Sequence, residues 1–282
     1  SALYGVLRPG DVLVSAVGAP YDTLLGVIGV TGEEPGSLKQ YGVAYRQVDI
    51  TADNQPDRAG LAQAVRDPKV KAVLIQRSKG YSTRASLSVA EIGELIAVVK
   101  ENNPQAAVIV DNCYGEFVEP TEPTQVGADL VVGSLIKNPG GGLAPTGGYL
   151  AGRHDLVEAA AMRLTVPGIG RECGSTLGNN RLLYQGLFLA PHTVAQALKT
   201  ALERAVEKHT QEELSMLVER ADSLENPQGK VYTVNSWNSL LAVKEICAAL
   251  TSESGEYDIS YWYGRLDARI NGLVSYMSEV KE

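Results

Sequence analysis

Short apolar runs recur along the first 150 residues, and segments with helical spacing separate them. The runs cover residues 12–17, 44–48, 71–76 and 106–110, and a further short strand begins at Val131. Most of these runs are apolar throughout, whereas a strand with one face in water alternates apolar and polar side chains. Strands that are apolar on both faces need helices on both sides, and strands that alternate with helices are typical of parallel sheets. The sequence therefore predicts an α/β fold with a mainly parallel sheet sandwiched by helices.

Helical segments are predicted between and after these strands. One helix begins near Asp22, and others cover residues 56–67, 88–102, 154–163 and 180–206. Pro191 marks a kink or a new start in the last of them. Residues 2–7 are typical of the end of a helix, so an N-terminal part of the same domain is expected to precede them.

The composition and the hydrophobic periodicity of the sequence change after about residue 203. Glycines become scarce, strand-like runs vanish, and apolar residues take helical spacing, as in Leu214, Leu217, Val218, Ala221 and Leu224. Three amphipathic helices of this kind would form a small bundle. We therefore expect two domains, an α/β core over residues 1–205 and an all-α helical bundle over residues 206–282.

The net charge, the lengths of the apolar runs and the spacing of the cysteines each argue against one class of protein or site. The net charge is −8, which argues against a nucleic-acid-binding protein. No apolar run reaches the roughly 18 residues of a membrane span. The three cysteines lack the spacing of a metal site or a disulfide framework, which favours a reducing, cytoplasmic environment.

Polar clusters follow four of the predicted strands. They comprise Tyr21, residues 76–78, residues 111–114 and residues 134–137. Ligands of open parallel sheets bind at the carboxyl ends of strands, so these clusters predict a site at one edge of the sheet.

Asp111 and Lys137 suggest the chemistry of this site. A buried carboxylate can hold a proton on a heterocyclic nitrogen, and a lysine that burial keeps partly neutral can form a Schiff base with an aldehyde. Pyridoxal phosphate needs both groups. Glycines 140–142 behind the lysine would let a ligand approach closely. The alternatives are a turn or helix-capping role for Asp111 and a surface role for Lys137.

Other polar residues near these strand ends have two interpretations each. Ser134 could contact the phosphate or be a plain turn hydroxyl, and Tyr21 could stack on the cofactor ring or pack in the core or an interface. The basic residues Arg77, Lys79 and Arg84 could meet anionic groups, including a phosphate from a neighbouring subunit, or form a solvated loop. Asn112 could orient its neighbours or be an ordinary strand-end amide.

Six sequence blocks carry a resemblance to a known family. They are LRPGD with PYDT (7–11, 20–23), GSLKQYGVAYRQVD (36–49), IQRSKGYSTR (75–84), VIVDNCYGEFVE (108–119), GSLIKNPGGGLAPTGGY (133–149) and RECGSTLGNNRLLYQGLFLAPH (171–192). Through these blocks residues 1–200 resemble the aluminium-resistance, or methionine gamma-lyase-like, family of pyridoxal-phosphate enzymes. The resemblance implies the large domain of fold type I, incomplete at its N-terminus.

The resemblance also implies roles for four residues. Lys137 would be the Schiff-base lysine and Asp111 the partner of the pyridine nitrogen. Tyr21 would be the stacking aromatic and Ser134 a phosphate ligand. The expected activity is a lyase reaction on sulfur amino acids such as methionine or cystathionine, with Lys137 as general base at the α-carbon. A small amino-acid substrate and a homodimer or homotetramer are expected as partners.

The C-terminal segment resembles a different protein class. Residues 214–276 are similar to a FIVAR module, a helical repeat of Gram-positive surface proteins, which by itself would suggest the cell surface. The alternative function is therefore a non-catalytic fusion or binding protein whose helical tail engages a partner.

Overall fold

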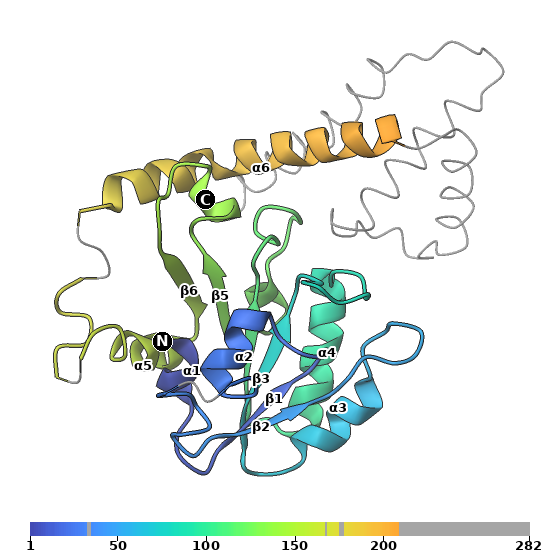
Figure 1. The fold of residues 1–282 in the computed structure, drawn as a ribbon, viewed down its shortest axis with the longest axis vertical. Helices are drawn as coiled ribbons and strands as arrows, with labels where there is room; N and C mark the ends of the chain where they lie inside the picture. The colour runs from blue at the N-terminus through green and yellow to red at the C-terminus, as the bar shows by residue number, and fades with distance from the viewer. Residues whose placement is uncertain (33–34, 167, 175–177, 209–282) are drawn as a thin grey trace.

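One six-stranded sheet organises the part of the chain that the structure describes, residues 1–32, 35–166, 168–174 and 178–208 of a computed structural model. Its strands lie in the order β2-β1-β3-β4-β5-β6 (Figure 1). All neighbours are parallel except β5 and β6, which pair antiparallel. The prediction of a mainly parallel sheet is confirmed. The strands are β1 Val12–Ser15, β2 Ala44–Gln47, β3 Val70–Gln76, β4 Ala107–Asp111, β5 Leu130–Ser134 and β6 Gly148–Gly152.

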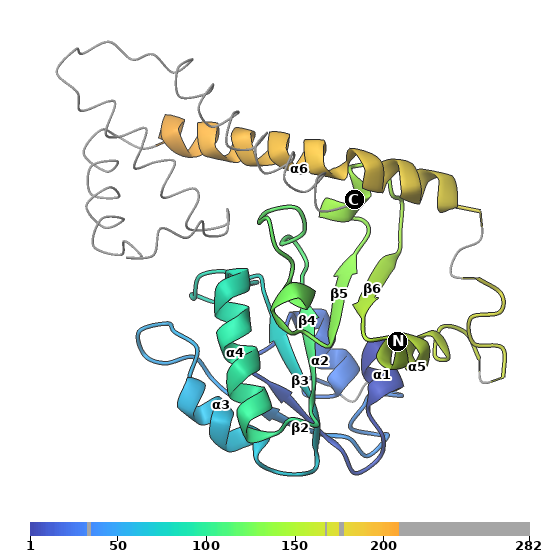
Figure 2. The ribbon, with the colours of Figure 1, turned by 180° about the vertical axis from the view of Figure 1, so that it is seen from behind.

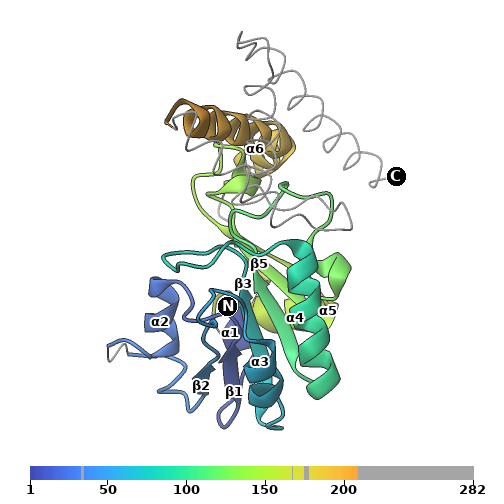
Figure 3. The same cartoon turned by 90° about the vertical axis from the view of Figure 1, so that its right-hand side faces the viewer.

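Helices cover both faces of the sheet, as Figures 2 and 3 show. In β1, Val12 and Val14 belong to a core cluster with α3 and α4, whereas Leu13 between them belongs to a second cluster with α1, α2 and α5. The two-residue period of a strand thus gives each face its own apolar layer. The α-helices are α1 Ala2–Val6, α2 Asp22–Ile28, α3 Arg58–Val65, α4 Val89–Asn102, α5 His154–Ala161 and α6 Asn180–Lys208, and the 3₁₀ helices are η1 Pro123–Val126 and η2 Asn138–Gly140.

Side-chain caps set the starts of two of these helices. The carboxylate of Asp57 accepts a hydrogen bond from the amide of Gly60, so α3 begins two residues later than its predicted start. Ser88 and Glu91 form a reciprocal capping box at the start of α4. Such caps satisfy amide groups that have no partner within the helix.

Helix α6 lies beyond the carboxyl ends of the parallel strands, next to η2 (Figure 1). Pro191 lies inside this continuous helix, which extends past residue 205, the predicted end of the first domain. Residues 209–282, with the FIVAR-like segment and nearly all of the predicted bundle, lie outside the described residues.

The described residues contain neither a membrane-spanning helix nor a cluster of metal ligands. Within residues 1–208, apart from the gaps named above, no helix is long and apolar enough to cross a membrane. Over the same residues, no group of three or more His, Cys, Asp or Glu side chains could hold a metal ion.

Candidate active site

The predicted polar clusters follow strands that end at one edge of the sheet. Gln76 at the end of β3 pairs in register with Asp111 at the end of β4, and Asp111 pairs with Val132 of β5. The backbone amide of Tyr21 donates to Oε1 of Gln76 at 2.7 Å, which ties the segment after β1 to the end of β3. Parallel pairing therefore brings residues that are distant in sequence to this edge.

Lys137 immediately precedes η2, and its Nζ lies 4.3 Å from the centroid of the Tyr114 ring. Its side chain is half-buried. Burial lowers the pKa of Lys137, but Cys113, Tyr114 and Asp111 outweigh burial and the pKa is raised above its usual value of 10.5. The prediction that burial keeps this lysine partly neutral is wrong, because the neighbouring groups favour the charged form.

Asp111 connects the turn after β4 with Lys137. Its Oδ1 accepts a hydrogen bond from the amide of Cys113 at 3.1 Å, which is the turn role considered as an alternative. Its negative charge also contributes to the raised pKa of Lys137. The carboxylate and the amine, 26 positions apart in sequence, therefore interact electrostatically in the fold.

Three tyrosines surround this edge of the sheet. Tyr21 stacks on Tyr81 with ring centroids 5.6 Å apart and planes inclined by 21°. The hydrogen bond with Tyr81 is the main cause that raises the pKa of Tyr21 to about 12, and the charge of Tyr114 contributes. The Tyr21 side chain is 41% exposed, so it does not pack in the core of the described chain.

Ser134 shapes the turn that carries Lys137. Its Oγ accepts a hydrogen bond from the amide of Ile136 at 3.3 Å, and its carbonyl accepts one from the amide of Lys137 at 3.3 Å. The structure thus gives Ser134 the turn contact that was considered as an alternative to phosphate binding.

The glycines behind Lys137 make room for a helix. A methyl group on Gly141 would overlap the carbonyl oxygen of Gly186 in α6, and one on Gly186 would overlap the carbonyl of Gly140. Thr193 also donates its hydroxyl to the carbonyl of Gly141 at 3.4 Å. The expectation that these glycines admit a ligand is corrected for Gly140 and Gly141, because Gly140 permits the close approach of the Leu135 carbonyl and Gly141 that of α6.

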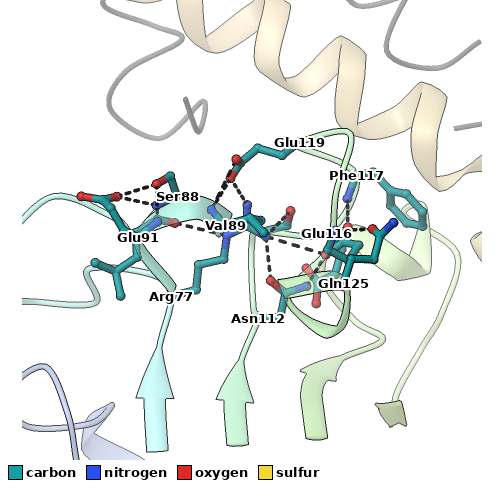
Figure 4. A network of polar contacts seen from close by, with 12 residues as sticks. Arg77, Ser88, Val89, Glu91, Asn112, Glu116, Phe117, Glu119 and Gln125 are labelled. Carbon is teal, nitrogen blue, oxygen red and sulfur yellow. Dashed lines mark hydrogen bonds and ion pairs between the residues drawn. The ribbon is translucent and has the colours of Figure 1, made fainter. Parts of the chain in front are cut away.

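Arg77 and Arg84 are each 2% exposed, so the interpretation as a solvated basic loop is wrong for both. Arg77 pairs with the carboxylate of Glu119 at 2.5 Å and donates to Oδ1 of Asn112 at 2.7 Å (Figure 4). Arg84 donates to the carbonyls of residues 76, 77, 78 and 85. Lys79 is exposed, as the solvated interpretation requires. Arg77 therefore meets anionic groups inside its own chain.

The turn after β4 contains buried glutamates that the sequence interpretation missed. Glu119 accepts hydrogen bonds from the amide of Val89 at the start of α4, and Glu122 accepts from Asn112 at 2.9 Å. Asn112 therefore orients its neighbours, as one of its two interpretations proposed. The signal in the sequence was the spacing of Glu116, Glu119 and Glu122 at three-residue intervals beside a buried strand.

Glu116 differs from the other two glutamates because it forms no ion pair within the part of the chain that the structure describes, whereas Glu119 and Glu122 both pair with Arg77. It is 4% exposed, and its Oε1 accepts a hydrogen bond from the hydroxyl of Tyr149 at 2.8 Å. Its Oε2 is buried and has no hydrogen-bond partner among the described residues. Burial is the main cause that raises the pKa of Glu116 to about 7. A carboxyl group in this setting is neutral over much of the acidic range.

The residues at this edge fit the requirements of pyridoxal phosphate. An amine that can bond an aldehyde lies within electrostatic reach of a carboxylate that can hold a protonated ring nitrogen. Tyr114 and Tyr21 place aromatic rings beside them. The two charged groups and the two rings follow different strands in the sequence, so only the folded chain brings them to one end of the sheet.

Comparisons with known proteins point to one family. The sequence profile of the methionine gamma-lyase family matches residues 1–224. YnbB from Bacillus subtilis (strain 168) is 56% identical over 202 residues, which cover 71% of this chain and 48% of YnbB. The chain spans about half the length of the curated relatives it matches.

Solved structures agree with that assignment. A crystal structure of a carbon–sulfur lyase involved in aluminium resistance, from Clostridium novyi NT, is 51% identical with a TM-score of 0.68, and the match covers 71% of this chain and 48% of that one. A pyridoxal-phosphate-dependent aminotransferase from Streptococcus suis is 20% identical with a TM-score of 0.52 over 85% of this chain and 56% of its own. The second likeness shows a shared fold alone.

Proposed function

The chain belongs to the methionine gamma-lyase family, and on that premise we propose that it is a pyridoxal-phosphate-dependent carbon–sulfur lyase that acts on sulfur amino acids. The observation that carries the proposal is the position of the Lys137 amine, 4.3 Å from the centroid of the Tyr114 ring and just beyond β5, which pairs with the strand that ends in Asp111. The name of the Clostridium novyi relative, a carbon–sulfur lyase, supports the reaction class.

Four residues take the proposed roles. Lys137 would bond the cofactor aldehyde through Nζ, and Asp111 would hold the proton of the ring nitrogen. Tyr21 would stack on the ring and Ser134 would bind the phosphate. Ser134 ends β5, the strand that precedes Lys137, and the amide of Tyr21 is bonded to Gln76 at the end of β3, the neighbour of β4, which supports their assignment.

The bound cofactor supplies an electron sink that stabilises negative charge at the substrate α-carbon. Lys137 would take the α-proton of the substrate on Nζ. The neighbouring groups Cys113, Tyr114 and Asp111 raise the pKa of Lys137, so they would stabilise the ammonium that this proton transfer leaves.

The substrate class and assembly are also proposed at this level. A small sulfur amino acid such as methionine or cystathionine is the proposed substrate, and a homodimer or homotetramer in the cytoplasm is the proposed form. Family membership supports the substrate class.

A titration with pyridoxal phosphate, followed by absorbance, tests the cofactor assignment. The wild-type chain should take up the cofactor and turn yellow, and borohydride should then fix the cofactor on Lys137. Lys137→Ala should abolish both signals. Lys71→Ala is the matched control, because Lys71 is an exposed lysine near the opposite end of β3 and should bind as the wild type does.

Two results would contradict the proposal. A wild-type chain that stays colourless with excess cofactor lacks the assigned site. Borohydride labelling at another lysine, found by peptide mass mapping, would remove Lys137 from its role. Release of a thiol and a 2-oxo acid from cystathionine or methionine then tests the reaction class.

A further inference from the structure

Glu116 is a buried carboxyl group to which the proposed chemistry gives no role. It follows Tyr114 by two residues in the turn after β4, and its Oε2 has no hydrogen-bond partner in the part of the chain that the structure describes. Burying a polar group costs free energy unless the group is hydrogen-bonded, so an apolar side chain would fill this space at lower cost. The contacts of Glu116 indicate what the carboxyl group does there.

The side chain of Glu116 packs against β5 just before the Lys137 turn. A methyl group on Gly133 would overlap both Oε1 of Glu116 and the ring of Tyr149. Gly133 and Tyr149 are register partners in β5 and β6, and the Tyr149 hydroxyl donates to the same Oε1 at 2.8 Å. The carboxyl group therefore lies against the backbone of β5 and is hydrogen-bonded to β6.

The backbone of Glu116 contacts the other end of that turn. Its carbonyl accepts a hydrogen bond from Nδ2 of Asn138 at 3.0 Å. Asn138 directly follows Lys137, and Gly133 directly precedes Ser134. One residue thus contacts both boundaries of the segment 134–137, which carries the proposed phosphate ligand and the proposed cofactor lysine.

We infer that Glu116 is a positioning residue, which holds the 134–137 turn in place so that the amine of Lys137 stays over the Tyr114 ring. The functional part of this inference rests on the proposed function, because it is the cofactor lysine that is held. The contacts with Gly133, Tyr149 and Asn138 are features of the chain alone.

Two readouts test this role in the full chain. The first is amide hydrogen exchange of the peptide that covers residues 133–141, without cofactor. The second is the rate at which added pyridoxal phosphate forms its Lys137-bonded absorbance band. Glu116→Ala should raise the exchange rate about tenfold and slow the band about tenfold, as expected when roughly one hydrogen bond's worth of restraint is lost.

Conservative variants separate positioning from general loss of stability. Glu116→Gln keeps an acceptor for Tyr149 and should stay within about threefold of the wild type in both readouts. Tyr149→Phe keeps the ring and removes the hydroxyl, so it should reproduce part of the Glu116→Ala effect. Glu94→Gln, an exposed site in α4, is the control and should change neither readout.

Unchanged exchange over residues 133–141 in folded Glu116→Ala would overturn the inference. If that variant does not fold, unchanged exchange in Tyr149→Phe overturns it instead. If the wild type takes up no pyridoxal phosphate, the proposed function fails, yet the exchange comparison still decides whether Glu116 holds the turn.

Discussion

Asp111 uses its oxygen atoms and its charge for different purposes. Oδ1 accepts a hydrogen bond from the amide of Cys113 in the turn after β4, while the negative charge helps to raise the pKa of Lys137. An asparagine can accept the same hydrogen bond but carries no charge. The two contributions of this residue can therefore be separated by one substitution.

We expect Asp111→Asn to fold and to bond pyridoxal phosphate but to lose lyase turnover by about two orders of magnitude or more, the size of a typical proton-transfer contribution. Turnover is measured as thiol release, with Asp111→Ala as the comparison that also removes the turn contact. Wild-type turnover in Asp111→Asn would exclude a role for its charge.

Glu116 links stability to pH. In the unfolded chain this carboxyl loses its proton near its ordinary pKa of 4.5, whereas in the folded chain it does so near 7. Between these values the folded state binds more protons, so stability is highest below pH 4.5 and falls as the pH rises to about 7. The groups facing it are Tyr149 from β6 and, within its own turn and β3, Glu122 and Arg77.

Glu116→Gln should remove this pH dependence. The free energy of unfolding of the variant relative to the wild type should rise between pH 4.5 and pH 8, by up to about 3 kcal/mol at 1.36 kcal/mol per pKa unit. Urea unfolding at several pH values measures the difference. Parallel stability curves for the two proteins would show that Glu116 titrates normally in the fold.

At the scale of elements, Arg77 ties three segments together. It extends from the end of β3 to Glu119, which also accepts the first amide of α4, and to the carbonyl of Gly115 in the turn after β4. Buried ion pairs add little net stability when formed, but removing one partner leaves the other charge buried without compensation.

Arg77→Met should therefore destabilise the chain by about 3–5 kcal/mol. Adding Glu119→Gln should recover a large share of the loss, because the uncompensated carboxylate is then gone. Urea unfolding of the two single variants and the double variant gives the coupling. Strictly additive losses would show that the pair is not the source of the effect.

The contact between α6 and η2 depends on glycine. Replacing a glycine inside a helix by alanine normally stabilises the helix by about 1 kcal/mol. At Gly186 the added methyl would overlap the carbonyl of Gly140, and overpacking of this kind costs about 1–3 kcal/mol. The two effects have opposite signs.

We expect Gly186→Ala to lower the melting temperature and to slow cofactor uptake, because η2 directly follows Lys137. Gly142→Ala is the comparison for backbone strain alone: a methyl group there would meet nothing within 4 Å, but at φ +78° it strains the backbone, so it should lower the melting temperature without any overlap with α6. A raised melting temperature in Gly186→Ala would mean that α6 can move away from η2 without cost.

At the scale of the whole molecule, the architecture could be predicted because short apolar strands alternate with helices along the chain. The predicted strand 71–76 and the observed Val70–Gln76 differ by one residue. The position of Asp111 and Lys137 after neighbouring strands also followed, since carboxyl ends of parallel strands share one edge. These inferences need only local patterns and one topological rule.

Other features could not be inferred because they depend on partners distant in sequence. Arg77 stands in a polar, glycine-containing loop sequence, and only the fold shows that Glu119 and Asn112 bury it. The glycine run that contains Gly140 and Gly141 looks the same in the sequence whether a ligand or another part of the chain approaches it. The contact of Glu116 with Gly133 requires the spatial order of β4, β5 and β6.

The contact between η2 and α6 joins two segments that the ribosome synthesises at different times. Gly186 is synthesised 46 residues after Gly140, and ribosomes add about 5–20 residues per second. The turn that carries Lys137 is therefore synthesised roughly 2–9 s before Gly186, the residue of α6 that packs on η2. A nascent chain stalled before residue 186 would already contain the lysine and its strand, but the helix that backs the turn would not yet exist.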